Sequence, residues 1–383
     1  MRVLISSGPA EPLYFPVVPF AWALRAAGHD VLVATPESFA PVVNGSGLPV
    51  AAVCGPLEMV EVMAHDRAGQ RITMPTNDAE AVVAIGKGFG RLAARTLDGV
   101  SAVIEQYRPD VVIAESHSYA GAAAAAAHGI PWVKHGLGPG DDYLAEVDGW
   151  AARELAAELE QLGLPGLPSS DLVLDTCPPV LRREGAESTQ PMRFVPYSQA
   201  GVLPHWLYEK PVRPRLLLTA GTVEPVIGRG VELFRELLNA LPSLGVEIVV
   251  AATDEVVSEL GPLPDAVIAA GWTPLTAVLP AIDIAVHHGG PGTTMACAYH
   301  GVPQLIIPGI AKPHESVRRL TSFGSAQRLL ADEVSAASVL EACGKLLAED
   351  SYRERAAALR EQITAMPSPG AVVALVEQLA DRR

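Results

Sequence analysis

Short runs of branched apolar residues alternate along the chain with longer segments rich in alanine and leucine. This alternation is typical of a parallel α/β fold, in which each strand is followed by a helix that covers the sheet. In the first half, the predicted strands are residues 2–6, 30–35, 110–116 and 131–136, and the predicted helices are Val17–Ala27 and residues 119–129.

The same pattern begins again after residues 208–215. The predicted strands are residues 216–222, 246–253, 266–272, 283–290 and 303–309, and the predicted helices are residues 230–241 and Pro291–Tyr299. Two such halves predict a pair of Rossmann-like domains facing a cleft, residues 1–207 and 208–366, with a boundary within residues 200–214. The remaining residues, 367–383, contain an amphipathic helix, Pro369–Ala380, which we expect to pack back on the first domain.

Composition narrows the class of protein. The chain has 383 residues and a net charge of −15, which argues against a surface that binds nucleic-acid duplexes. Its four cysteines are far apart and lack metal-site spacing, as expected of free thiols in a reducing cytoplasm. The N-terminal apolar run is too short for a signal peptide, and His, Gly and Pro interrupt the alanine-rich stretch 119–133. We therefore expect a soluble, cytoplasmic protein with no membrane span.

The stretch "DIAVHHGGPGTT", residues 283–294, places a strand end, a glycine-rich turn and a helix start in direct succession. In a doubly wound sheet, ligands bind beyond the carboxyl ends of the strands, where helix N–H groups attract anions. The residues that would supply close backbone approach and hydrogen-bond donors are His288, Gly289, Gly290, Gly292, Thr293 and Thr294. The pattern indicates a pyrophosphate site that is neither GxGxxG nor GxxxxGK[ST], although a tight turn with a capping threonine explains the same residues.

A longer stretch around this motif, residues 271–308, resembles the donor-binding signature of the GT-B glycosyltransferases that decorate antibiotics, bacterial relatives of the plant nucleotide-sugar transferases. Weaker resemblance extends over residues 15–31, 173–181, 195–201, 218–222 and 361–379. These outer segments look most like transferases that act on aromatic polyketides, including C-glycosyltransferases of angucycline type. The resemblance implies a GT-B fold and a dTDP-sugar or UDP-sugar donor. It implies neither a cofactor nor a metal, and the adjacent acids of "GDDY" are not a D-x-D element.

The resemblance also implies roles for individual residues. Trp272 would stack on the nucleotide base, with Pro274 and Leu275 beside the base through their backbone groups. Residues implied to hold the diphosphate are Gly221, Thr222, His288, Gly290, Gly292, Thr293 and Thr294.

The chain departs from this family at the base that deprotonates the acceptor. The family usually has a histidine in the first loop, and the matching position here is Leu13. The candidate replacements are Asp142 with its neighbour Asp141, then His117 with Glu115 as partner, and finally Glu11. By resemblance, Asp142 lies where polyketide C-glycosyltransferases carry an acidic residue, but a helix-capping aspartate explains it equally well. A carboxylate is a poor base for an alcohol but serves for a phenol, so the loss of the histidine favours a phenolic acceptor.

A second departure concerns the sugar. The family often has an Asp-Gln pair that holds hexose hydroxyls, and the matching positions here are Lys312 and Pro313. Because unmade buried hydrogen bonds are costly, this loss favours a 2,6-dideoxyhexose donor. Lys312 and His314 are then candidates for contacts with the sugar or diphosphate.

The hydrophobic acceptor is expected in the first domain. Candidate acceptor contacts are Pro9, Met59, Met63 and Met74, although ordinary core packing explains the methionines as well. Together these observations predict an inverting transferase that moves a deoxysugar to an aromatic polyketide through an O- or C-glycosidic bond. A nucleotide-sugar epimerase and a degenerate auxiliary protein that activates a partner transferase remain alternatives. A homodimer is compatible with each of these three functions.

Overall fold

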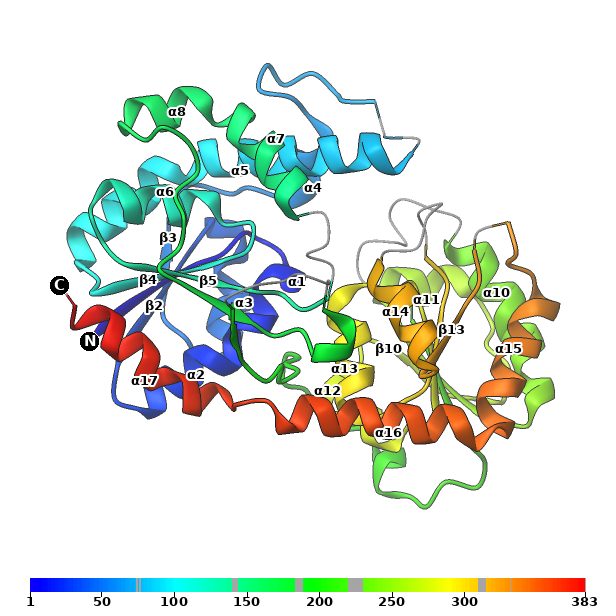
Figure 1. The fold of residues 1–383 in the computed structure, drawn as a ribbon. Helices are drawn as coiled ribbons and strands as arrows, with labels where there is room; N and C mark the ends of the chain where they lie inside the picture. The colour runs from blue at the N-terminus through cyan, green and yellow to red at the C-terminus, as the bar shows by residue number, and fades with distance from the viewer. Residues whose placement is uncertain are drawn as a thin grey trace. The chain divides into compact units, whose positions relative to one another are not determined.

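The computed structural model describes residues 1–73, 75, 77–139, 144–182, 189–219, 230–308, 315–330 and 332–382. Contacts divide the chain into two compact units (Figure 1). The first unit comprises Met1–Cys177, Arg183–Gln199 and Met366–Arg383, and the second comprises Pro178–Arg182 and Ala200–Ala365. Residues 200–208 belong with the second unit because Trp206 packs against the core of that unit. The carbonyl of Trp206 also accepts a hydrogen bond from Arg215.

The first unit is built on a parallel sheet with the strand order β3-β2-β1-β4-β5-β6-β7. Its strands are β1 Arg2–Ser6, β2 Asp30–Thr35, β3 Val50–Ala52, β4 Val111–Glu115, β5 Trp132–His135, β6 Leu172–Asp175 and β7 Gln190–Pro191. Its α-helices are α1 Glu11–Tyr14, α2 Val18–Ala26, α3 Ala40–Gly45, α4 Met59–Ala64, α5 Asp78–Tyr107, α6 Tyr119–Ala127, α7 Leu144–Glu154, α8 Ala156–Gln161 and α17 Pro369–Ala380. The strands predicted from the apolar runs in this half are therefore confirmed.

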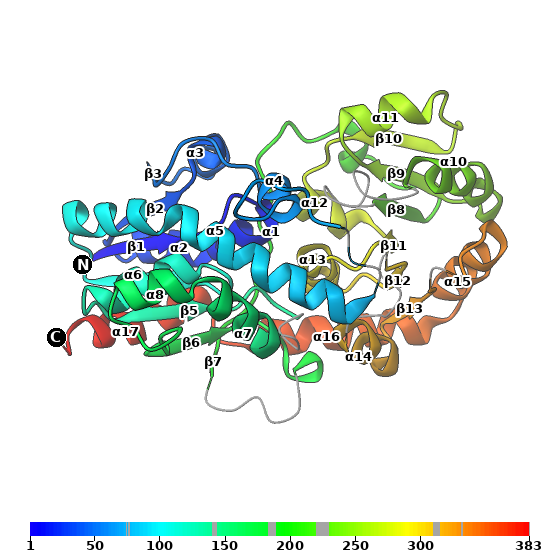
Figure 2. The same cartoon turned by 90° about the horizontal axis from the view of Figure 1, so that it is seen from above.

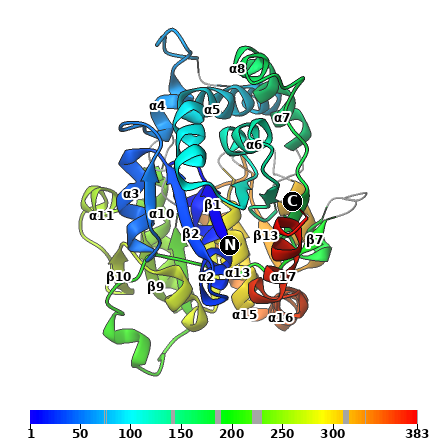
Figure 3. The same ribbon diagram turned by 90° about the vertical axis from the view of Figure 1, so that its left-hand side faces the viewer.

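Alternating side chains of these strands enter two cores, one on each face of the sheet. Leu4 and Val112 pack with α5, α6 and α7, whereas Val3, Ile5 and Val111 pack with α2 and α17. Figure 3 shows α5 and α6 on one side of the strands and α2 and α17 on the other. The C-terminal helix thus completes the core of the first unit.

The second unit has a parallel sheet with the order β10-β9-β8-β11-β12-β13, which Figure 2 shows strand by strand. Its strands are β8 Arg215–Thr219, β9 Glu247–Ala251, β10 Val267–Gly271, β11 Ile284–His287, β12 Gln304–Ile306 and β13 Ala326–Arg328. Its α-helices are α10 Gly230–Ala240, α11 Asp254–Leu260, α12 Leu275–Val278, α13 Pro291–His300, α14 Glu315–Phe323, α15 Ala336–Ala348 and α16 Asp350–Ala365. Leu216 and Leu218 face one core and Leu217 faces the other, so helices cover both faces.

One segment, Asp350–Ala380, is long and apolar enough by composition to cross a membrane. In the structure this segment forms two helices, α16 and α17. Val372, Val373 and Val376 of α17 are buried in the core of the first unit. These buried valines account for part of the apolar character of the segment.

Candidate active site

The strand order of the second unit places a switch point between β8 and β11. Because β9 and β10 continue to one side of β8 and β12 and β13 to the other side of β11, the loops after β8 and β11 diverge. Thr219 and His287 end these two strands and pair in register. Gly221 and Thr222, predicted to face the diphosphate from the β8 loop, lie outside the described residues.

The ring of His288 lies at the beginning of α13. A side-chain carbon on Gly290, the N-cap residue, would be 2.5 Å from Nε2 of His288 and 3.0 Å from its Cε1. Only glycine at position 290 therefore leaves room for the imidazole in this position. Nδ1 of His288 is buried and has no hydrogen-bond partner within the described part of the chain. Burial lowers the pKa of His288 to about 4, so the ring is neutral at pH 7 and can donate one N–H.

The first turn of α13 provides amide donors beside this ring. Pro291 at the first helical position has no N–H, and the N–H of Thr294 already donates to the carbonyl of Gly290 at 2.9 Å. Helix geometry therefore leaves the N–H groups of Gly292 and Thr293 as the free donors of the turn. The side chain of Thr294 is 2% exposed, so its hydroxyl lies inside the helix start and not on its surface.

Trp272 follows β10 at the same edge of the sheet, and 52% of it is exposed. Pro274 is buried and caps α12, because its carbonyl accepts the N–H groups of Ala277 and Val278. The N–H of Leu275, the first residue of α12, is one of the amides that helix geometry leaves without an intrahelical acceptor. An indole, an amide and a helix start thus share one edge of the second sheet.

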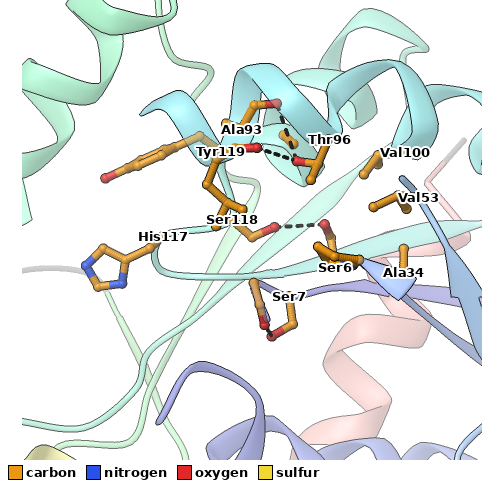
Figure 4. Close-up of a pocket in the computed structure, with 14 residues that line it drawn as sticks. Ser6, Ser7, Ala34, Val53, Ala93, Thr96, Val100, His117, Ser118 and Tyr119 are labelled. Carbon is orange, nitrogen blue, oxygen red and sulfur yellow. Dashed lines mark hydrogen bonds between the residues drawn. The ribbon is translucent and has the colours of Figure 1, made fainter. Parts of the chain in front are cut away.

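The switch point of the first unit lies between β1 and β4 and contains a small pocket with both polar and apolar lining residues. Ser6, Ser118 and Thr96 line it, and the hydroxyls of Ser6 and Ser118 are 2.7 Å apart (Figure 4). His117 also lines the pocket, but its ring is directed away from this hydroxyl pair. His117 follows the last residue of β4, Glu115, by two positions. This candidate base thus lies at the carboxyl end of the strand, where an α/β sheet binds its ligands.

The ring of His117 lies against Phe89 and close to Glu115. The His117 ring stacks on Phe89 with centroids 4.3 Å apart, and its Nδ1 lies 3.8 Å from Oε2 of Glu115. Burial, with the charge of Lys134 adding to it, lowers the pKa of His117 to about 4. The buried carboxylate of Glu115 accepts the backbone N–H of His117 at 2.8 Å and that of Gly8 at 3.4 Å, so it ties two loops together.

The other candidates for proton transfer have different positions. Asp141 and Asp142 lie outside the described residues. Leu13, which occupies the position of the family's histidine, is buried in the core against α5. Glu11 is the half-buried first residue of α1.

Packing accounts for the acceptor candidates that the structure describes. Met59 and Met63 lie on α4 and contact the core around α5, and the thioether of Met63 fills the space beside Gly88. Pro9 is buried. Met74, like the sugar candidates Lys312 and His314, falls outside the described residues.

Sequence reasoning missed two residues that shape the turn before α13, whereas Glu115 was predicted as the partner of His117. His287 and Gln304 are buried behind the turn before α13, and Glu115 is buried behind His117. The adjacent histidines carried the available signal, because successive side chains of a strand point to opposite faces and only one of them can face the ligand edge.

Both halves of the chain match models of one protein family. Residues 22–221 match the N-terminal domain of the erythromycin biosynthesis protein CIII-like family, and residues 235–379 match its C-terminal domain.

Individual relatives are similar over nearly the whole chain. The L-demethylnoviosyl transferase of Streptomyces niveus is 40% identical, covering 97% of this chain and 96% of that protein. The elloramycin glycosyltransferase ElmGT of Streptomyces olivaceus is 35% identical, covering 98% and 96%. A crystal structure of the glycosyltransferase SsfS6 of Streptomyces sp. SF2575, complexed with thymidine diphosphate, has a TM-score of 0.87 at 40% identity and covers 99% of both chains.

These similarities confirm the α/β, GT-B architecture of two Rossmann-like domains and the predicted transferase class. The chain belongs to the erythromycin biosynthesis protein CIII-like family and is a glycosyltransferase of antibiotic polyketide biosynthesis.

Proposed function

We propose that this enzyme transfers a 2,6-dideoxyhexose from a dTDP-sugar to an aromatic polyketide, with inversion at the sugar carbon. The observation that carries the donor part is the neutral ring of His288 placed at the start of α13. The thymidine diphosphate in SsfS6, which is 40% identical, supports the choice of base. The epimerase and auxiliary-protein alternatives lose their support because the relatives that match nearly the whole chain are named transferases.

The donor is held at two points along one sheet edge. The exposed indole of Trp272 stacks on the thymine, and the N–H of Leu275 meets the edge of the base. The N–H groups of Gly292 and Thr293 and the imidazole of His288 bind the diphosphate. Because the leaving group is a nucleoside diphosphate, these donors stabilise the negative charge that develops as the sugar departs.

A base in the first unit removes the acceptor proton. His117 is neutral at pH 7 and has a lone pair for that proton, and the carboxylate of Glu115 stabilises the imidazolium that forms. Asp142 is the second candidate, on resemblance alone. Either group is a weak base, which suits a phenol and not an alcohol. In C-glycosylation, the phenolate increases electron density at its ring carbon, and that carbon attacks the sugar.

Donor binding is tested by calorimetry with dTDP. We expect Trp272→Ala to raise Kd by about tenfold or more, because base stacking contributes ~1–3 kcal/mol. Trp22→Ala is the matched control, since Trp22 is 44% exposed but lies in the first unit. Equal affinities of wild type and Trp272→Ala would refute the stacking role.

The base is tested by comparing His117→Gln with Asp142→Asn on a panel of phenolic polyketides. The variant that removes the base should lower kcat by ~10²–10⁴ while leaving the Kd for dTDP unchanged. His128→Gln, a change at the end of α6, is the control. Normal kcat in both test variants would exclude both residues as the base, and NMR of the product distinguishes a C-glycoside from an O-glycoside.

A further inference from the structure

The first histidine of the pair, His287, is part of a buried hydrogen-bond chain. Its Nε2 lies 2.8 Å from Oε1 of Gln304 on β12, and its Nδ1 lies 3.0 Å from the backbone nitrogen of Gly289. His287 is 2% exposed and Gln304 is fully buried. The imidazole therefore joins the neighbouring strand to the turn that precedes α13.

The partners determine which nitrogen carries the proton. A backbone N–H can only donate, so Nδ1 must accept from Gly289 and carries no hydrogen. Nε2 then carries the hydrogen and donates it to the side-chain oxygen of Gln304. Burial, together with the neighbouring His288, lowers the pKa of His287 to about 3, so this neutral form persists at pH 7.

The turn held by this contact is tightly constrained. Gly289 has a φ of 87°, in the left-handed region, and a side-chain carbon on it would lie 2.8 Å from Cγ2 of Ile306. The N–H of Gly289 is directed to His287 and is therefore not available to a ligand. The next residue, Gly290, is the N-cap of α13, and the ring of His288 packs against it.

We infer that His287 and Gln304 are positioning residues for the diphosphate site: the chain Gln304–His287–Gly289 sets the orientation of the turn, and the turn places His288 and the first amides of α13. This inference rests on the proposed donor site. His287 and Gln304 act through the turn and do not touch the sugar nucleotide.

The opposite tautomer shows why Gln304 matters. With hydrogen on Nδ1, two donors would face each other at 3.0 Å, and the contact with Gly289 would be repulsive. The oxygen of Gln304 prevents this by accepting the hydrogen at Nε2. Removing that oxygen frees the imidazole to change tautomer and releases the turn.

The test compares two ligands, dTDP and thymidine, on two substitutions of Gln304. Gln304→Met removes the acceptor oxygen at similar volume, and Gln304→Glu keeps an oxygen in its place. We expect Gln304→Met to raise the Kd for dTDP about tenfold and that for thymidine less than twofold, because only the diphosphate uses the turn. Gln304→Glu should restore most of the dTDP affinity.

His135→Gln is the matched control. His135 is a fully buried histidine at the end of β5 in the first unit, so its loss perturbs folding without reaching the donor site. The ratio of dTDP affinity to thymidine affinity in His135→Gln should equal that of wild type. Unchanged dTDP affinity in Gln304→Met, or an equal loss for both ligands, would overturn the inference.

Two further results separate this inference from the proposed function. If wild type binds dTDP no better than thymidine, the diphosphate site itself is wrong. If Gln304→Met does not fold, ¹⁵N NMR of histidine in the wild type decides, because hydrogen on Nε2 of His287 supports the chain and hydrogen on Nδ1 refutes it.

Discussion

Gly201 meets the edge of the Trp272 ring. A side-chain carbon on Gly201 would lie 2.8 Å from Cζ3 of Trp272, 3.5 Å from Cη2 and 3.8 Å from Cε3. The two ring atoms bonded to Cζ3 are clearly farther away than Cζ3 itself, so the approach is in the plane of the ring and not over its face. The backbone of Gly201 therefore limits how far the indole can tilt, while both faces stay clear of this residue.

A methyl group at position 201 should disturb the indole. We expect Gly201→Ala to raise the Kd for dTDP and for thymidine alike, by about three- to tenfold, because a tilted ring loses part of the ~1–3 kcal/mol of base stacking. This equal effect contrasts with the dTDP-selective effect of Gln304→Met. Gly166→Ala is the control, because no atom lies within 4 Å of its added carbon. Wild-type affinity in Gly201→Ala would show that the ring tolerates the contact.

Gly290→Ala tests the placement of His288. Since the added carbon would lie 2.5 Å from Nε2, the ring must leave the start of α13. Affinity for dTDP should fall about tenfold or more, because hydrogen bonds to charged groups contribute ~1.5–3 kcal/mol, and thymidine affinity should change little. Calorimetry with both ligands measures this difference. Tight dTDP binding by the variant would mean that His288 does not contact the diphosphate.

The buried ring of His135 should make the protein sensitive to acid. Burial lowers its pKa from 6.5 to about 4, so the folded state binds a proton less readily than the unfolded state. Stability from this group is complete above pH 6.5, falls as the pH drops from 6.5 to 4, and is lost below that. A shift of this size corresponds to about 3 kcal/mol in the free energy of unfolding.

Urea denaturation of wild type and His135→Phe between pH 4 and 7.5 measures this contribution. Phenylalanine has a similar shape and cannot be protonated, and Phe20 already lies beside the ring. We expect a flatter pH dependence in the variant. Parallel curves for the two proteins would assign the acid sensitivity to other groups.

Two helical glycines should respond in opposite ways to alanine. A side-chain carbon on Gly99 of α5 would overlap the carbonyl oxygen of Val53 and lie 2.5 Å from its carbonyl carbon, whereas one on Gly149 of α7 has nothing within 4 Å. Gly99→Ala should destabilise the first unit by about 1–3 kcal/mol. Gly149→Ala should stabilise it by roughly 0.5–1 kcal/mol, because alanine is the better helix former. Thermal denaturation of both variants tests the pair.

Local sequence was sufficient for the regular elements around the glycine-rich turn and at the C-terminal helix, but it did not predict the long helix α5 or the strands β3, β6, β7 and β13. Residues 283–294 contain a buried strand, a glycine turn and a helix start, and the structure has β11 and α13 there. Pro369–Ala380 is a helix with the predicted bounds. These features are predictable because the hydrophobic period, glycine and proline each influence only the backbone conformation of residues close to them in the sequence.

The sequence by itself predicted the two parallel sheets and a helix start directly after a buried strand, and the family resemblance added Trp272 as a candidate for the base. Tertiary structure alone decided how His287 and His288 divide their roles, since one depends on Gln304, 17 residues away, and the other on the space above Gly290. It also decided that Gly201 limits Trp272. Such contacts join positions that no local period relates, so they arise only when the strands are placed side by side.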